Sequence, residues 1–394
     1  MDRDERRRSR RRRARESARA RRRRGATLIA LALLAAAAFA VGMISGGAEP
    51  APERDELPAL KPLPDGLSDI QLAGQRLVAG FEGTGVPGGL ERLIRNGRIG
   101  GVVIFAGNVA GKGDLRREMD ELQAIPRPPG LREPLIVMTD QEGGAVERID
   151  GPPNASAAEM GARGREYAAR QGRRTARLLG RVGVNVDLAP VLDVGRPGAA
   201  ITNEGRSFGG APATVIGAGV NGFAAGLRAG GIAATAKHFP GFGAAAVNTD
   251  FAPQEIGVSR ARLRRIDERP FAAFADRGGE LIMLSVARYS AFGGAPAALN
   301  RAIASGELRG RLGFDGVSVT DSLDAQAVRS YGGRAIVARR AAAAGSDLLL
   351  YGDWRTARSS GRTLAQALRR GKLDRERFEA SVQRILALRP ELKG

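Results

Sequence analysis

The chain has no cysteine, a single histidine and few aromatic residues, which make up 5% of its 394 residues. The missing cysteines exclude disulfide bonds, thiolate metal sites, cysteine nucleophiles and lipid attachment through an N-terminal cysteine. One histidine and no cysteine also argue against a transition-metal site, so we expect no metal and no other cofactor. Lysine is rare as well, with five lysines beside 57 arginines.

The one histidine, His238, directly follows one of the rare lysines, Lys237, after the apolar segment 231–236. The chain otherwise uses arginine for positive charge. A lysine beside the only histidine therefore indicates a site that needs the compact ammonium group as hydrogen-bond donor rather than the planar guanidinium group. A lone histidine is more often a structural residue. Here, however, the segment reads as a strand running into a Gly/Pro turn, where α/β folds present their chemistry.

Half of the net charge of +20 lies in residues 1–24, which hold 14 arginines and four acidic residues. Twenty uncharged residues follow, Gly25 to Ile44, and as a helix they would span roughly 30 Å, the thickness of a membrane's hydrocarbon core. The pattern predicts a basic cytoplasmic tail and an uncleaved transmembrane signal anchor at 25–44, with the remaining chain outside the cytoplasm at the cell membrane. A protein secreted after cleavage near Ala48 is the alternative. A buried soluble helix would leave the arginines without a role.

A nucleic-acid-binding protein is a rival interpretation of so much positive charge. The chain lacks aromatic residues interleaved with basic ones, and it lacks zinc-ligand and helix-turn-helix spacing. We therefore expect no nucleic-acid partner. The basic tail is better explained as an orientation signal that also meets anionic lipid at the membrane.

Residues 45–65 are rich in proline and charge and show no apolar periodicity, which is typical of a linker. From residue 66 to 394, short β-type runs alternate with longer helical stretches, which predicts a single (β/α)8 TIM-type barrel domain of the α/β class. A doubly wound sheet is the weaker alternative. The eight expected strands are Leu77–Phe81, Gly101–Phe105, Leu135–Thr139, Val184–Leu188, Ile232–Ala236, Leu281–Val286, Gly316–Thr320 and Asp347–Tyr351. Expected helices include Ala157–Leu179, Ala213–Ala229, Arg260–Arg277, Gly333–Ala344 and Asp374–Leu388.

Polar residues follow the C-terminal ends of four predicted strands, and these ends form the active site of a barrel. We therefore expect them to converge on one mouth together with Arg206, where their donors and acceptors would suit a polyhydroxylated ligand. Asp140 and Asp321 stand directly at strand ends, whereas Asp324, one turn into a helix, is expected to be a cap or loop residue. The four segments are 140–144, 187–193, 237–238 and 321–324.

Five strings occur in order between about residues 70 and 350. They are Asp-Gln-Glu-Gly-Gly-Ala-Val-Glu-Arg (140–148), Asp-Leu-Ala-Pro-Val-Leu-Asp-Val (187–194), Arg-Ser-Phe-Gly (206–209), Lys-His-Phe-Pro-Gly (237–241) and Gly-Phe-Asp-Gly-Val-Ser-Val-Thr-Asp-Ser-Leu (313–323). Together they resemble glycoside hydrolase family 3, and within it the β-N-acetylglucosaminidase branch.

The resemblance implies a barrel that acts as a retaining glycosidase on β-linked N-acetylglucosaminides or related cell-wall glycan fragments. It implies that Asp321 is the nucleophile and that the first sugar subsite is formed by Asp140, Arg206, Lys237 and His238. A retaining mechanism also needs an acid/base group, which protonates the leaving oxygen and then activates water.

At the acid/base position the sequence departs from the family pattern. The family's acetylglucosaminidases continue after Lys-His-Phe-Pro-Gly with His-Gly-Asp-Thr and an Asp-Ser-His, whose Asp–His pair is the acid/base. This chain has Phe-Gly-Ala-Ala (242–245), and by position Asp250 replaces the catalytic histidine and Asn248 its supporting aspartate. Asp250 then serves as a carboxylic acid/base with a raised pKa, or Glu142 or another carboxylate takes the role. The third alternative is an impaired homologue that binds sugar or cell-wall glycan without cleaving it.

Overall fold

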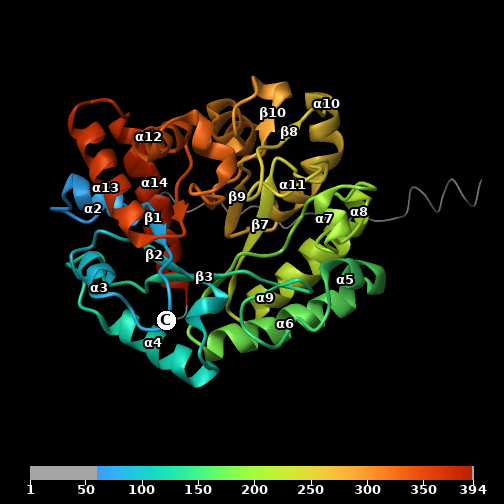
Figure 1. The fold of residues 1–394 in the computed structure, drawn as a ribbon, viewed down its shortest axis with the longest axis horizontal. Coiled ribbons are helices and arrows are strands. Elements are labelled where there is room, and N and C mark those ends of the chain that lie inside the picture. Colours follow the sequence, from blue (N-terminus) through green and yellow to red (C-terminus); the bar gives the residue numbers. More distant parts are fainter. Residues whose placement is uncertain (1–59, 393–394) are drawn as a thin grey trace, which may run out of the picture. The chain divides into compact units, whose positions relative to one another are not determined.

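The structure is a computed structural model that describes residues 60–392 (Figure 1). Its centre is a sheet of eight parallel strands arranged in chain order. They are β1 Leu77–Ala79, β2 Gly101–Ile104, β3 Ile136–Thr139, β6 Val186–Asp187, β7 Ala233–Phe239, β9 Leu281–Leu284, β11 Val317–Thr320 and β12 Leu349–Tyr351. Each lies within or overlaps one of the eight predicted strands, so the strand predictions are confirmed.

Main-chain contacts join the two outer strands, β11 and β12, and bring the sheet to near closure. Val319 and Leu348 form a parallel bridge, and the N–H of Thr320 donates to the carbonyl of Leu348 at 2.9 Å. A closed ring has no free strand edge, and eight parallel strands alternating with helices make a TIM-type barrel. The predicted barrel is confirmed, and the doubly wound open sheet is wrong.

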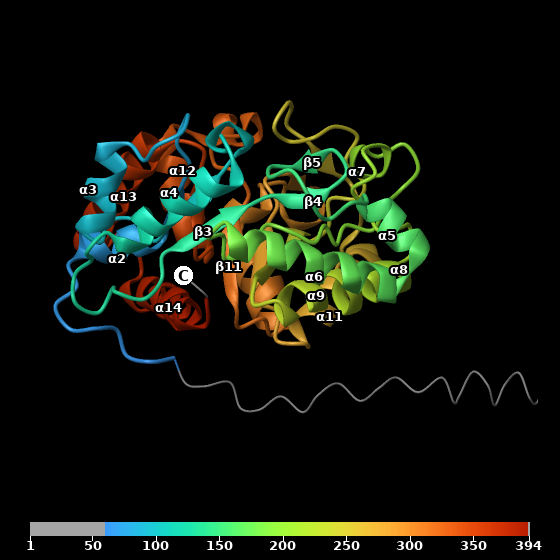
Figure 2. The ribbon, with the colours of Figure 1, turned by 90° about the horizontal axis from the view of Figure 1, so that it is seen from below.

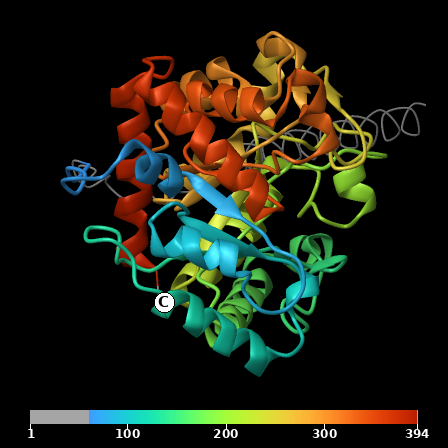
Figure 3. The same ribbon diagram turned by 60° about the vertical axis from the view of Figure 1, so that its left-hand side comes forward.

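Helices surround the strands (Figure 1). The larger ones are α2 Asp69–Gln75, α3 Gly88–Arg95, α4 Lys112–Ala124, α5 Ala157–Arg163, α6 Arg165–Arg181, α9 Ala225–Ala229, α11 Arg269–Ala275, α12 Arg334–Ala344, α13 Trp354–Arg369 and α14 Arg375–Leu388. Shorter turns include α7 Ala200–Asn203, α8 Pro212–Thr214 and α10 Arg260–Arg262, and three segments have π-type hydrogen bonding: η2 Val215–Ala224, η3 Leu263–Asp267 and η6 Ala302–Arg311. Figure 3 shows α2, near the start of the described chain, beside the C-terminal helices, which it contacts.

The predicted helices are confirmed, with interruptions in two of them. The expected helix Arg260–Arg277 has a turn residue, Glu268, between η3 and α11. The expected helix Ala157–Leu179 divides into α5 and α6 at Gly164, whose φ of 79° lies in the left-handed region that favours glycine. The last helix agrees closely with its prediction. Asp374 caps it by accepting a hydrogen bond from the N–H of Arg377, and Phe378, Val382 and Ile385 form its buried face.

Two apolar layers hold the barrel together. Inside the ring, strand residues such as Val103, Met138 and Val319 are fully buried, and Ile385 and Leu388 of α14 join the same cluster. Each aliphatic side chain buried in this way contributes about 1.5–3 kcal/mol. A second, larger layer packs the outer faces of the strands against the helices.

The two ends of the barrel differ. Leu388 and Leu392 border the same hollow as Ile232 and Ala233, which lie at the start of β7, so α14 covers the N-terminal end of the strands. At the opposite end an antiparallel hairpin of β4 Gln141–Gly143 and β5 Val146–Glu147 follows β3. Figure 2 shows this hairpin and α14 on opposite sides of the barrel. A second pair of short strands, β8 Glu255–Ile256 and β10 Arg288–Tyr289, follows β7 and β9.

The predictions for the N-terminal region fall largely outside the described residues. The basic tail 1–24 and the transmembrane segment 25–44 are not described, nor is the linker 45–65 before residue 60. Within residues 60–392, no helix combines the length and the hydropathy needed to cross a membrane.

Candidate active site

A cavity of about 260 Å³ opens at the C-terminal end of the strands. All six residues predicted for the site line it: Asp140, Arg206, Lys237, His238, Asp250 and Asp321. Two of them lie in β7 and the other four in the connections after β3, β6, β7 and β11, so the fold brings together residues that are up to 181 positions apart in the chain. Their placement agrees with the expectation that polar groups converge on one mouth.

Lys237 is the cation at the base of this site. It is buried, and its Nζ lies 2.6 Å from Oδ1 of Asp140 and 2.7 Å from Oε1 of Glu142. Burial lowers the pKa of Lys237, but the two carboxylates outweigh burial and raise it, so the ammonium stays charged. A charged point donor at this position can bind a hydroxyl group while it holds both carboxylates in place.

Arg206 binds Glu142 through two parallel hydrogen bonds. Its Nε and Nη2 each lie 2.8 Å from one of the carboxylate oxygens, and its Nη1 lies 3.1 Å from Glu204. Burial alone would raise the pKa of Glu142, yet Lys237 and Arg206 lower it to about 2. Glu142 therefore remains ionised, with both oxygens bound to cations.

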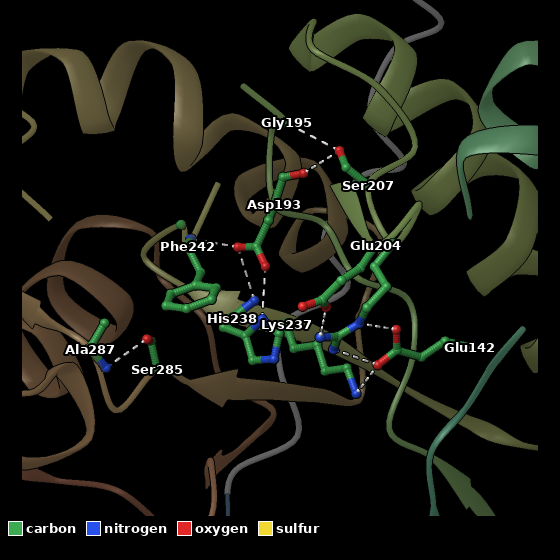
Figure 4. A network of polar contacts seen from close by, with 12 residues as sticks. Glu142, Asp193, Gly195, Glu204, Ser207, Lys237, His238, Phe242, Ser285 and Ala287 are labelled. Atoms are coloured by element: carbon green, nitrogen blue, oxygen red, sulfur yellow. Dashed lines mark hydrogen bonds and ion pairs between the residues drawn. The ribbon is translucent and has the colours of Figure 1, made fainter. Parts of the chain in front are cut away.

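His238 is oriented by a buried carboxylate, Asp193 (Figure 4). The imidazole Nδ1 lies 2.8 Å from Oδ2 of Asp193, while Oδ1 accepts from the main-chain N–H groups of His238 at 3.2 Å and Phe242 at 2.6 Å. Because a carboxylate only accepts hydrogen bonds, Nδ1 carries the hydrogen and Nε2 is the nitrogen left for a ligand. His238 itself lines the cavity.

Lys237 and His238 lie within β7 rather than after it, which corrects the predicted end of this strand. All seven residues of β7 are buried, and the strand continues to Phe239. The register of β7 against β9 shifts between Ala236 and Phe239, and the Lys237–His238 peptide bond is cis. Parallel pairing with Leu284 of β9 and a bridge to Val191 extend the strand beyond the apolar run that marked it in the sequence.

Asp321 directly follows β11. Its N–H donates to the carbonyl of Leu284 at 2.9 Å, and its Oδ1 accepts from the N–H of Ser322 at 2.7 Å. These two bonds fix the residue at the strand end and leave Oδ2 without an intramolecular bond among those described. A carboxylate held in this way on a rigid element is suited to attack a bound substrate.

Asp250 lies on the connection between β7 and β8. Its N–H donates to Oδ1 of Asn248 at 3.0 Å, and its side chain lines the cavity although the residue keeps more than a third of its surface exposed. Partial loss of water raises the pKa of Asp250, and the charge of Asp321 raises it further, against smaller opposing effects of His238 and Arg206. The charge of Asp321 thus acts on the carboxyl group with which it is predicted to form the catalytic pair.

Two other aspartates of the predicted mouth have different surroundings. Asp187 is completely buried in β6, where Oδ1 accepts from the N–H of Gln141 at 3.0 Å, and burial raises its pKa well above the usual range. Asp324 lies in a turn rather than in a helix, does not line the cavity, and accepts from the N–H of Gly352 at 2.9 Å. Asp324 is thus a loop-stabilising residue, in agreement with its expected role.

Two further side chains matter to the site although the sequence assigned no role to either of them. Arg148 lines the cavity with one guanidinium nitrogen 3.9 Å from Oδ2 of Asp140, because the β4–β5 hairpin returns it to the mouth. It ends the string 140–148, so its position in that string was the available signal. Asp193 also belonged to a quoted string, but nothing in the sequence paired it with His238.

Among residues 60–392, no cluster of three or more carboxylates and histidines has the arrangement of a metal site. The carboxylates nearest the cavity floor are instead neutralised by Lys237 and Arg206.

Comparisons with known proteins agree with this geometry. The sequence profile of the glycosyl hydrolase family 3 N-terminal domain matches residues 88–388. An uncharacterized secreted glycosyl hydrolase of Arthroderma benhamiae is 37% identical over 340 residues, covering 82% of this chain and 93% of that protein. A beta-hexosaminidase of Alkalilimnicola ehrlichii is 32% identical over 283 residues, covering 70% of this chain and 79% of that protein.

Solved structures show the same similarity. A family 3 beta-N-acetylglucosaminidase from a Paenibacillus species superposes with a TM-score of 0.77 and 32% identity, over 82% of this chain and 62% of that one. A beta-N-acetylhexosaminidase from Beutenbergia cavernae gives a TM-score of 0.75 and 30% identity, over 82% and 98% of the two chains. The present chain thus spans less than two thirds of the first protein and nearly all of the second. By its sequence and its barrel, the chain belongs to glycoside hydrolase family 3.

Proposed function

We propose that this protein is a retaining glycosidase that hydrolyses β-linked N-acetylglucosaminides or related cell-wall glycan fragments, with Asp321 as nucleophile and Asp250 as acid/base. The observation that carries the proposal is the shared cavity, in which Asp250 and Asp321 lie together with four polar residues suited to bind a sugar. The substrate class is that of the beta-hexosaminidase and beta-N-acetylglucosaminidase relatives.

Sugar binding rests on the charged groups at the cavity floor. Asp140 has one oxygen 2.6 Å from Lys237, and its other oxygen faces Arg148 at 3.9 Å, so it retains acceptor capacity for a hydroxyl. Lys237, Arg206 and His238 add donors around it. Acceptors and donors placed side by side can bind neighbouring hydroxyl groups of one sugar ring and fix its orientation.

In the first step, an oxygen of Asp321 bonds to the anomeric carbon while the bond from that carbon to the leaving oxygen breaks. Asp250 transfers its proton to the leaving oxygen, which departs as a neutral alcohol. In the second step, Asp250 removes a proton from water, the water oxygen bonds to the anomeric carbon, and the ester bond to Asp321 breaks. Two inversions give a product with the original β configuration.

The electrostatics of the pair suit both roles of Asp250. Before the reaction, partial burial and the negative charge of Asp321 raise the pKa of Asp250, which favours its protonated form. Formation of the ester removes the charge of Asp321, which lowers the pKa of Asp250 and favours its action as a base. The same carboxyl group can therefore give a proton in one step and accept one in the next.

Glu142 is a poor alternative for the acid/base. Both of its oxygens are bonded to Arg206 or Lys237, and these cations lower its pKa to about 2. It has no proton to give near neutral pH. Its contacts favour a role in positioning the two cations.

The second candidate is a sugar-binding protein without turnover. It is favoured by the partial exposure of Asp250 and by Asn248, which stands where the family has the aspartate that supports the catalytic histidine. Loss of an acid/base typically lowers the rate 10²- to 10⁴-fold. Such a protein would bind N-acetylglucosamine and turn over only activated glycosides, slowly.

The proposal also includes an extracytoplasmic location, with segment 25–44 as the membrane tether. Its support is the arginine cluster before an uncharged run of membrane-spanning length. The Arthroderma benhamiae relative is described as secreted, which fits the alternative of release near Ala48. Either location would bring the barrel into contact with cell-wall glycan.

A product assay on the soluble domain tests the function. Wild type and Asp321→Asn are incubated with aryl N-acetylglucosaminide and aryl glucoside, and the anomeric form of the released sugar is followed by NMR. We expect release of the β anomer from the N-acetylglucosaminide by wild type and none by Asp321→Asn, which should still bind N-acetylglucosamine. Turnover at the wild-type rate by the variant would remove Asp321 from the mechanism. Tight sugar binding without turnover by wild type would favour the binding protein.

A further inference from the structure

The connection between β7 and β8 exposes two apolar side chains next to the cavity. Val247 is 43% exposed and Phe251 is 72% exposed. Only four large apolar residues are exposed among residues 60–392, and the other two, Leu60 and Ile336, lie elsewhere in the chain. Two of the four therefore fall within five residues of one another, in a segment that also supplies the cavity wall.

This segment is held in a defined turn. The carbonyl of Asn248 accepts from the N–H groups of Phe251 at 3.1 Å and Ala252 at 3.3 Å, and its side chain accepts from the N–H of Asp250. The N–H of Val247 donates to the side chain of Gln254 at 3.2 Å, and Thr249 is buried. The exposed position of Phe251 thus belongs to a hydrogen-bonded loop.

The position of the loop puts Phe251 next to the part of the substrate that leaves. Asn248, Thr249 and Asp250 line the cavity, and Phe251 follows Asp250 at the spacing of adjacent Cα atoms, about 3.8 Å. In the proposed mechanism Asp250 contacts the leaving oxygen, so the group attached to that oxygen lies at the level of this loop. The charged residues that bind the first sugar come instead from β7 and from the segments after β3 and β6.

The charged residues that bind the first sugar suit its hydroxyl groups, whereas the apolar side chain of Phe251 suits a different part of a sugar ring. A sugar ring presents hydroxyl groups at its edge and C–H groups on its faces, and a large aromatic side chain can cover such a face and bury apolar surface. An exposed phenyl group otherwise loses stabilisation by facing water. A sugar beyond the scissile bond would cover Phe251 as it binds.

We propose that Phe251 is the binding surface for the sugar on the leaving-group side, so that the preferred substrate carries at least one further sugar ring beyond the scissile bond. This inference rests on the proposed function and narrows its substrate class to glycan chains and their oligosaccharide fragments. Val247 is exposed on the same loop but precedes the cavity-lining residues Asn248 to Asp250 in the chain, and it serves as the control.

The test compares two substrates that share the first sugar. One is the β-linked disaccharide of N-acetylglucosamine, and the other is the corresponding β-glycosyl fluoride, whose leaving group has no ring. Replacement Phe251→Ala should lower kcat/KM for the disaccharide about 10-fold, the size expected for loss of one aromatic contact, and should change the value for the fluoride by less than about 2-fold. Phe251→Trp should restore disaccharide activity, and Val247→Ala should behave as wild type.

Equal losses on both substrates would show that the loop acts on catalysis in general, and an unchanged disaccharide rate would also overturn the proposal. If wild type cleaves neither substrate, the proposed hydrolysis fails, and calorimetric affinities for the disaccharide and for N-acetylglucosamine then decide the role of Phe251. The disaccharide should bind more tightly than the monosaccharide only when Phe251 is present. The proposed role of Phe251 would be refuted if wild type and Phe251→Ala preferred the disaccharide over the monosaccharide to the same extent. It would also be refuted if wild type bound neither sugar.

Discussion

Asp193 orients His238, with Nδ1 of the imidazole 2.8 Å from Oδ2 of a carboxylate that is completely buried. The other oxygen of Asp193 accepts from the main chain of the His238 and Phe242 segment. One carboxylate thus fixes the ring, its tautomer and the turn that follows. The residues are 45 positions apart, so this relationship exists only in the folded barrel.

Replacing Asp193 with Asn tests the importance of this tautomer. The amide oxygen can still accept from the main chain, but the amide nitrogen would donate to Nδ1 and move the imidazole hydrogen to Nε2. We expect KM and the Kd for N-acetylglucosamine to rise roughly 10- to 100-fold, since a charge-assisted hydrogen bond is lost and the ring presents the wrong atom. Steady-state kinetics and calorimetry measure both. An unchanged Kd in a variant with wild-type Tm would show that His238 does not contact sugar through Nε2.

Glu142→Gln should destabilise the fold. Lys237 and Arg206 would remain buried without the carboxylate that bridges them, and breaking a buried ion pair by removing one partner costs about 3–5 kcal/mol. Urea unfolding at pH 7 measures the free energy of unfolding. The control Asp120→Asn, which breaks the exposed ion pair of Arg116 with Asp120, should change it far less.

The effect of Glu142→Gln should also depend on pH. The pKa of Glu142 is about 2 in the folded protein and 4.5 ordinarily, so its stabilising contribution is present above pH 4.5 and disappears as the pH falls towards 2. The difference in stability between wild type and variant should shrink through this window. A difference that stays constant down to pH 2 would contradict the ionised bridge.

The pH dependence of kcat/KM reports the identity of the acid. Asp250 must be protonated to donate, so activity should fall as pH rises through its pKa, which burial and Asp321 raise above the ordinary value of 3.8. In Asp250→His the donor is an imidazolium with an ordinary pKa near 6.5, and the basic limb of the profile should move to higher pH. The control Asp250→Glu keeps a carboxylic acid at this position and should leave the limb close to its wild-type position. An identical basic limb in wild type and Asp250→His would mean that another group donates the proton.

The N-terminal sequence predicts that the barrel lies outside the cytoplasm and is tethered to the membrane. Because arginines precede the uncharged segment 25–44, we expect protease added to intact spheroplasts to remove the barrel domain. A cleaved and secreted protein would be recovered from the medium instead. Survival of the domain until the membrane is permeabilised would show that the orientation is wrong.

Much of the fold could be predicted from the sequence because its signals are local. Runs such as the one before Asp321 combine β-branched residues with a Gly-containing start, and the barrel buries them on both faces. The strand ends that carry Asp140 and Asp321 were found for the same reason. The division of one helix at Gly164 was missed because glycine is tolerated within helical patterns, and only the left-handed φ reveals the break.

The site was less predictable wherever it depends on contacts across the barrel. The hairpin that returns Arg148 to the cavity, and the packing that buries Asp187 below it, follow from tertiary structure rather than from spacing. The extent of β7 was misjudged because Lys237 and His238 are polar, while their pairing with neighbouring strands keeps them in the sheet. Exposure of Phe251 likewise has no local signal.

Chemical rescue of Asp250→Ala tests the central claim most directly. With an activated aryl N-acetylglucosaminide, the leaving group needs little protonation, and the slow step becomes attack of water on the glycosyl ester of Asp321. Azide is a nucleophile that needs no general base, so we expect it to restore turnover of the variant and to give the β-glycosyl azide. Wild type, which still has its acid/base, should not be accelerated. The assignment of Asp250 and Asp321 would be contradicted if azide failed to restore turnover or if the product were the α-glycosyl azide. It would also be contradicted if Asp250→Ala hydrolysed the disaccharide at the wild-type rate.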